Sequence, residues 1–206
     1  FNEWYMIKKY NNKILTCGID EAGRGAMAGP VTISAVILPK NYYNPEIKDS
    51  KKLTDSKKIK LFKEIKKIAI SYAITDLNNE EIDHLNILEA TFLGMNKSIE
   101  KLKIKPQIYL IDGNRFNTGK KIKYKCIIGG DDKYQSIAAA SILSKVHRDN
   151  LMKKIDTEFP EYNWKQNKGY GTKEHIEKIK KNGLSKYHRR SFKIKNKQLS
   201  LDVWVL

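Results

Sequence analysis

The fold of this chain is decided by the stretch GIDEAGRGAMAGPV, residues 18–31. It links two apolar, β-rich runs, residues 14–19 and 31–38, through a turn that contains three glycines. We expect the first strand to stop at Asp20 and Glu21. Neighbouring residues of a regular strand point to opposite faces, so the turn that follows would have to rotate Glu21 to the side of Asp20.

The spacing of apolar residues predicts an α/β architecture around this stretch. A helix is predicted after the N-cap Thr54, and others over residues 88–102, 134–156 and 173–182. Further strands are predicted near residues 70–75, 107–112 and 122–128. The resulting order, β-β-α-β-α-β-β-α-α, indicates a mixed five-stranded sheet flanked by helices. We expect one main domain over residues 14–156 and a smaller, basic, mainly helical appendage over residues 157–206.

The charge of the chain favours a polyanionic partner. Its 206 residues carry 40 Lys and Arg against 23 Asp and Glu, a net charge of +17. Residues 165–197 hold twelve of the basic residues and two Glu, and nucleic acid is the commonest partner of such a cluster. No apolar run approaches the roughly 20 residues that cross a bilayer, and no signal segment opens the chain. With only two cysteines, we expect a cytoplasmic protein with no membrane contact.

Acidic residues stand out where the predicted strands end. Asp20 and Glu21 follow the first strand, Asp112 ends the strand before Gly113, and Asp131 and Asp132 follow the last strand. The ends of strands are where open α/β sheets assemble their sites, and carboxylates gathered there repel one another unless cations neutralise them. Mg²⁺ and Mn²⁺ prefer oxygen ligands, and a pair of such ions is a clamp for phosphodiester cleavage. The four histidines, in contrast, show no zinc-ligand spacing.

Six segments stand out in order along the chain: GIDEAGRGAMAGPV (18–31), DSKKL (49–53), IDG (111–113), SIAAASILSKVHRD (136–149), NKGYGTKEH (167–175) and HRRSF (188–192). With these segments the chain resembles the ribonuclease HII family. The resemblance implies a ribonuclease H-like fold, with residues 14–156 as its catalytic domain. It also implies an endonuclease that hydrolyses the RNA strand of RNA–DNA hybrids and cuts 5′ of single ribonucleotides embedded in duplex DNA. The products would carry 3′-hydroxyl and 5′-phosphate ends.

The resemblance assigns roles to individual residues. Asp20, Glu21, Asp112 and Asp131 would be the catalytic carboxylates and hold Mg²⁺ or Mn²⁺, two ions per site, with Asp132 as the alternative to Asp131. Gly23, Arg24 and Gly25 would sense the 2′-hydroxyl, and Tyr170 would stack on a neighbouring sugar. Candidate phosphate contacts are Lys51, Lys52, Arg189 and Arg190. Asp149 either supports the site or pairs with a neighbouring base.

The end of the chain suggests a protein partner. The tail begins QLSL at residue 198, which resembles the start of the peptides that bacterial replication proteins dock into the sliding clamp. It departs from them where they continue with phenylalanine, because Asp202, Val203 and Trp204 follow here.

Nothing in the sequence indicates an oligomer, so we expect a monomer. Its first residue, Phe1, indicates a trimmed or partial N-terminus.

Two alternative functions were weighed. A non-catalytic nucleic-acid-binding module on the same fold would lack at least one carboxylate, yet all four are present. A ribonuclease of the sister HIII type usually carries an additional N-terminal domain, whereas only about a dozen residues precede the first strand here. The glycine-arginine-glycine turn also favours HII.

Overall fold

A five-stranded sheet, in the order β3-β2-β1-β4-β5, forms the centre of the computed structural model, which describes residues 9–11, 13–48 and 50–193. Strands β1 (Thr16–Ala22), β2 (Val31–Ile37) and β3 (Ser71–Leu77) pair antiparallel. Strands β4 (Ile108–Asp112) and β5 (Tyr124–Ile127) run parallel to β1. The predicted mixed sheet of five strands is confirmed.

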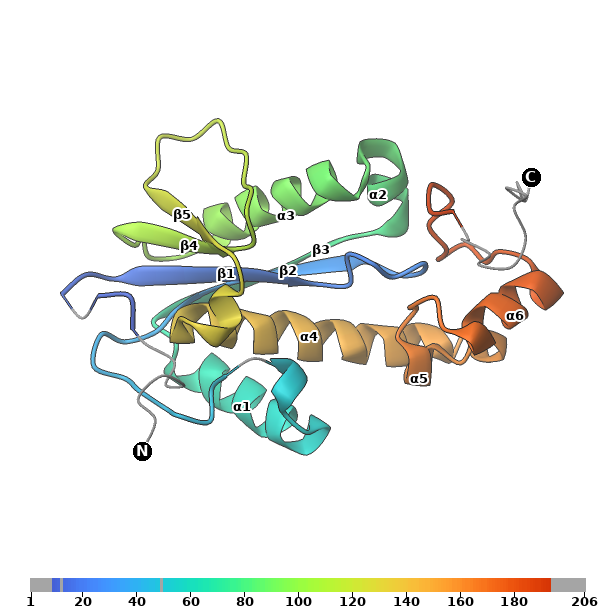
Figure 1. The fold of residues 1–206 in the computed structure, drawn as a ribbon, viewed down its shortest axis with the longest axis horizontal. Coiled ribbons are helices and arrows are strands. Elements are labelled where there is room, and N and C mark those ends of the chain that lie inside the picture. The colour runs from blue at the N-terminus through green and yellow to red at the C-terminus, as the bar shows by residue number, and fades with distance from the viewer. Residues whose placement is uncertain (1–8, 12, 49, 194–206) are drawn as a thin grey trace.

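Helices cover both faces of this sheet (Figure 1). On one face lie α2 (Asn79–Leu85) and α3 (Ile87–Lys101), and on the other α1 (Asp55–Ile68) and α4 (Gln135–Asp156). Each face has its own apolar core. Ile33, Leu77 and Met95 belong to the α3 side, and Leu61 and Ile142 to the side of α1 and α4.

The predicted helix ends agree with the structure where a cap sets them. Helix α1 begins after Thr54, whose hydroxyl accepts a hydrogen bond from the Lys57 amide at 3.4 Å. Helix α2 was not predicted. Its signal was a capping box, in which Asn78 and Glu81 each accept a hydrogen bond from the backbone N–H of the other.

Helix α4 lies unusually close to the central strand. A Cβ atom at Gly18 would come within 2.1 Å of the backbone of Ser136, so only glycine allows β1 and α4 to approach this far. The run of small side chains in Ala138, Ala139 and Ala140 is fully buried against the sheet. This packing places the middle of α4 beside the carboxyl end of β1.

The described chain after α4 packs on the turn that follows β1. It contains the short helices η4 (Pro160–Tyr162) and α5 (Trp164–Asn167), and then α6 (Lys173–Asn182). Trp164 and Ile179 share a core with Ala28 of the turn and Met152 of α4. Helices α5 and α6 accordingly lie at the end of the molecule that the turn after β1 reaches (Figure 1). No helix in the described ranges is long and apolar enough to cross a membrane.

Candidate active site

The predicted carboxylates meet at one end of the sheet. Because β1, β4 and β5 are parallel, their carboxyl ends lie side by side. Asp20 and Glu21 come from β1, and Asp112 is the last residue of β4. Asp131 lies in the short helix η3 (Gly130–Asp132) that follows β5, and the Gly130 N–H donates to the Asp112 Oδ1 atom at 2.7 Å.

The expectation that the first strand stops at Asp20 and Glu21 is wrong. Strand β1 continues to Ala22, and its pairing with β2 includes Asp20, Glu21 and Ala22. The pairing of β1 with β4, however, ends at Ile19. Beyond this point the β4 side of β1 is open, and Asp20 and Glu21 both line the same cleft although they are neighbours on a strand.

This cleft has a volume of about 450 Å³ and brings together most of the predicted site. Its walls carry the four carboxylates, the glycine-arginine-glycine turn, and residues from α1, α4 and the segment before α6. The lining consists of Asp20, Glu21, Ala22, Gly23, Arg24, Gly25, Ser50, Lys51, Lys58, Asp112, Asp131, Ser141, Lys145 and Tyr170. Asp131 is buried, whereas Asp132 is exposed and does not line the cleft.

Electrostatic repulsion between the carboxylates is evident in their acidities. Burial, followed by the nearby charges of Glu21 and Asp112, raises the pKa of Asp20 well above its usual value. Burial also raises the pKa of Glu21, against the opposing effect of the Arg24 guanidinium, which donates to Glu21 Oε1 at 3.2 Å. At the Asp131 carboxylate, the Lys51 ammonium lies 3.9 Å from Oδ2. Protein cations therefore offset part of the charge in the cleft.

The donor set suits a hard divalent cation. The Glu21 Oε2 atom is buried and accepts no hydrogen bond from the described residues, which leaves it available as a ligand. Carboxylate oxygens are the ligands that Mg²⁺ and Mn²⁺ prefer. As the side chains lie, no three Asp, Glu, His or Cys residues of the described ranges are grouped closely enough to hold an ion.

Two buried arginines fix the turn that carries Gly23, Arg24 and Gly25. The Arg148 guanidinium donates to the carbonyl oxygens of Ala28, Pro30 and Lys168 at 2.8–3.1 Å. The Arg189 guanidinium donates to the carbonyl oxygens of Arg24 and Gly29 at 2.9 and 3.0 Å. The turn is thus held from beneath by side chains that lie more than 100 residues away in the sequence.

Tyr170 is presented to the cleft from a rigid support. Its ring is partly exposed, with the Lys145 ammonium and the Arg148 guanidinium 5.9 and 5.4 Å from its centroid. Its carbonyl oxygen lies 3.0 Å from His175 Nδ1, and a backbone bridge joins Tyr170 to Ala26 of the turn. The backbone of Tyr170 is thus attached to the turn that follows β1.

Two of the four predicted phosphate contacts lie away from the cleft. Arg189 is only 2% exposed and supports the turn instead of facing solvent. Arg190 is exposed but does not line the cleft, and its backbone N–H donates to Asp83. The Lys52 side chain is outside the described part of the structure. Lys51 does line the cleft and is 84% exposed.

The sequence analysis missed several lining residues on the helices. Ser141 and Lys145 are four residues apart on α4, and Lys58 comes from α1. The signal for the first two was their helical spacing, because residues at i and i+4 share one face of a helix. Because the chain contains many lysines, no local pattern separates Lys58 from the others, and it could not have been selected from the sequence.

Comparison with known proteins places relatives of this chain in one family. The family model for Ribonuclease HII matches residues 17–195. A ribonuclease HII of Christiangramia forsetii is 51% identical over 197 residues, covering 96% of this chain and 100% of that relative. One from Parabacteroides distasonis is 47% identical over 187 residues, covering 91% and 94%.

Solved structures share the fold. The ribonuclease H2 from Pyrococcus horikoshii OT3 superposes with a TM-score of 0.75 at 25% identity, over 86% of this chain and 93% of that one. In the PCNA:RNase HII complex from Archaeoglobus fulgidus, the matched chain gives a TM-score of 0.74 at 25% identity, over 90% and 98%. The fold is thus that of the ribonuclease H2 and HII enzymes. Together with the sequence relatives, these matches show that the chain belongs to the ribonuclease HII family, whose members are nucleases that hydrolyse the RNA strand of RNA–DNA hybrids.

Proposed function

We propose that the protein cuts duplex DNA on the 5′ side of single embedded ribonucleotides, in addition to hydrolysing the RNA strand of hybrids. The observation that carries this proposal is one cleft that joins four carboxylates to the glycine-arginine-glycine turn and to Tyr170. Carboxylates alone would suit any metal-dependent nuclease. The turn and the tyrosine add a surface that can distinguish one sugar from another, which recognition of a single ribonucleotide requires.

In this proposal, Asp20, Glu21, Asp112 and Asp131 hold two divalent cations, Mg²⁺ or Mn²⁺. The chemistry that such ions supply when bound is activation of the attacking water and stabilisation of charge on the departing 3′ oxygen. Cleavage then leaves 3′-hydroxyl and 5′-phosphate ends. The four carboxylates position the ions, and no nucleophilic side chain is needed.

The remaining residues of the cleft position the substrate. Backbone groups of Gly23 and Gly25 approach the 2′-hydroxyl without an intervening side chain, and the Tyr170 ring packs on the next sugar. Lys51, at the exposed rim, attracts a backbone phosphate. Arg189 acts differently from the expectation for a phosphate contact, because its hydrogen bonds to Arg24 and Gly29 make it a positioning residue for the turn.

The test is cleavage of an end-labelled DNA duplex that contains one ribonucleotide, with Mg²⁺, Mn²⁺ or EDTA, beside an all-DNA control of the same sequence. We expect a single metal-dependent cut 5′ of the ribonucleotide and an intact control. Tight binding without a cut would favour the alternative, a non-catalytic nucleic-acid-binding module on the same fold. Cleavage of hybrids without cleavage at the single ribonucleotide would restrict the activity to longer RNA segments.

We further propose that the protein acts as a cytoplasmic monomer and that its C-terminal tail binds a sliding clamp. Residues 198–206, which carry the clamp-like sequence, lie outside the described residues. The structural relative from Archaeoglobus fulgidus is described in a complex with PCNA. Support for clamp binding by this chain therefore rests on the sequence of its tail.

A further inference from the structure

The surroundings of Lys145, in the middle of helix α4, differ from those of the lysines near the end of that helix. It lies on the face of α4 that also carries Ser141, and both residues line the active-site cleft. Its side chain is 27% exposed, whereas Lys153 and Lys154, two turns later on α4, are exposed and do not line the cleft. The packing of α4 against β1 thus directs this one ammonium group to the carboxylate site.

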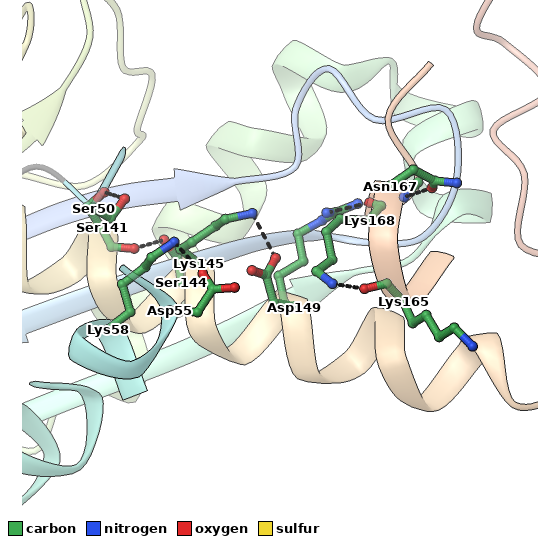
Figure 2. A network of polar contacts seen from close by, with 12 residues as sticks. Ser50, Asp55, Lys58, Ser141, Ser144, Lys145, Asp149, Lys165, Asn167 and Lys168 are labelled. Carbon is green, nitrogen blue, oxygen red and sulfur yellow. Dashed lines mark hydrogen bonds and ion pairs between the residues drawn. The ribbon is translucent and has the colours of Figure 1, made fainter. Parts of the chain in front are cut away.

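Two contacts hold that ammonium group in place. Its Nζ atom donates to Asp149 Oδ1 at 2.8 Å, and it lies 5.9 Å from the centre of the Tyr170 ring. Figure 2 shows the Lys145 side chain extending along α4 to Asp149, away from the Ser50–Ser141 hydrogen bond at the other end of the cleft. The charge therefore rests on the Tyr170 side of the site.

The stability of α4 does not account for this pair. In helices, an acidic residue four places before a lysine stabilises more than the reverse order, and here the lysine comes first. Asp149 is only 17% exposed, so its carboxylate gives up part of its hydration to reach Lys145. An arrangement of this kind is expected where the position of the ammonium group matters for a ligand.

The geometry points to a new substrate contact: we propose that Lys145 binds a backbone phosphate next to the scissile one, and that Asp149 is the positioning residue that holds its ammonium group over Tyr170. This inference rests on the proposed function. A strand that brings one phosphate to the carboxylates and a sugar to Tyr170 must carry its next phosphate past that ring. Lys145 supplies the positive charge at this place.

The first test compares Lys145→Met with Lys154→Met, a matched change at an exposed lysine of the same helix. Binding to an RNA–DNA hybrid is measured in EDTA across a salt series. We expect K145M to weaken binding about tenfold and to lower the salt slope by about one, because one phosphate contact is lost. K154M and Lys145→Arg should bind nearly as the wild type does. Equal binding by K145M and K154M would overturn the proposal.

The second test isolates Asp149 with Asp149→Asn, which keeps the shape of the side chain. General electrostatics predicts tighter binding, because the variant is one charge more positive. We expect the opposite: D149N should bind several-fold more weakly and cut several-fold more slowly than the wild type. In the K145M background, the same substitution should cause neither loss. Tighter binding at wild-type cleavage rate would refute the positioning role.

These results separate the two proposals. If the wild type fails to cut at a single ribonucleotide, the proposed function fails whatever the variants bind. If the wild type cuts and K145M behaves as K154M does, only the role of Lys145 is wrong. Thermal unfolding of each variant identifies any that is misfolded, and if K145M is misfolded, the predicted loss of binding in D149N carries the comparison.

Discussion

Gly23 and Gly25 are two residues apart in one turn, yet the structure gives a different reason why each is a glycine. Substitution by alanine should therefore affect folding at Gly23 and cleavage at Gly25. Gly23 has a φ of +91°, where a residue with a side chain costs about 1–2 kcal/mol. A Cβ atom there would lie 1.9 Å from Arg148 Nε. The Arg148 side chain cannot move aside freely, since three backbone carbonyls hold it.

The magnitude for Gly23→Ala follows from these two costs. Displacing the Arg148 guanidinium breaks at least one hydrogen bond from a charged donor, which costs about 1.5–3 kcal/mol. Added to the backbone strain, this predicts a loss of about 3–5 kcal/mol in the free energy of unfolding. In a chain of this size the midpoint of thermal unfolding should fall by roughly 10 °C.

Gly25→Ala should behave in the opposite way. The φ of Gly25 is not in the left-handed region, and a Cβ atom there meets no atom of the described residues within 4 Å. Folding should therefore be unaffected, or favoured by up to about 1 kcal/mol, because alanine restricts the unfolded chain. Gly25 lines the cleft, so under the proposed function the added methyl group would crowd the substrate sugar.

The assay pairs unfolding with cleavage of a duplex that contains a single ribonucleotide. We expect G25A to unfold as the wild type does and to lose most of its cleavage, and G23A to be clearly less stable. The reasoning would be refuted if G25A cut at the wild-type rate, or if the two variants lost stability equally.

Four further outcomes are expected. Burial, with the neighbouring His175, lowers the pKa of His188 to about 4, so the unfolded chain takes up a proton first as the pH falls. The contribution of His188 to stability should be complete above pH 6.5 and decline by about 3 kcal/mol toward pH 4, and urea unfolding of His188→Gln should lack this decline. Asp112→Asn should abolish cleavage and keep salt-sensitive binding to duplexes, and a variant that still cuts would exclude Asp112 as a ligand. Arg189→Ala should lower the free energy of unfolding by about 2–4 kcal/mol, since it leaves the Arg24 and Gly29 carbonyls unpaired, whereas a surface phosphate contact would leave unfolding unchanged. A double variant, Leu201→Ala with Trp204→Ala, should lose clamp binding at full stability, and a loss of folding instead would contradict the docking proposal.

Local signals in the chain predicted the fold well. Apolar periodicity located the five strands and the long helices, and the cap Thr54 set a helix start that the structure confirms. The short helix α2 was missed because its seven residues are too few for a clear period. The end of β1 was misplaced because the glycines begin one residue after Ala22, and a glycine-rich turn does not prevent pairing up to its first residue.

Residues of the candidate site could be predicted where neighbouring residues in the sequence mark them, and not where their role depends on distant parts of the chain. Acids that end apolar strands are visible in sequence, which predicted that Asp20, Glu21 and Asp112 would gather, and in the structure they line one cleft. Arg189 was predicted to be a phosphate contact from the resemblance of its segment to the family. Its burial depends on carbonyl groups of Arg24 and Gly29, 160 or more residues earlier in the chain, and no local pattern records such a contact.

The order of the elements, the basic character of the chain and its set of carboxylates follow from the sequence alone, because periodicity, charge and residue type are properties of neighbouring residues. Tertiary structure decided which cations face the substrate and which support the turn. Lys145 and Arg148 are three residues apart on one helix, yet one lines the cleft and the other lies beneath Gly23. Their separate roles arise from the close packing of α4 on β1 and from the chain after α4 folding back onto the turn.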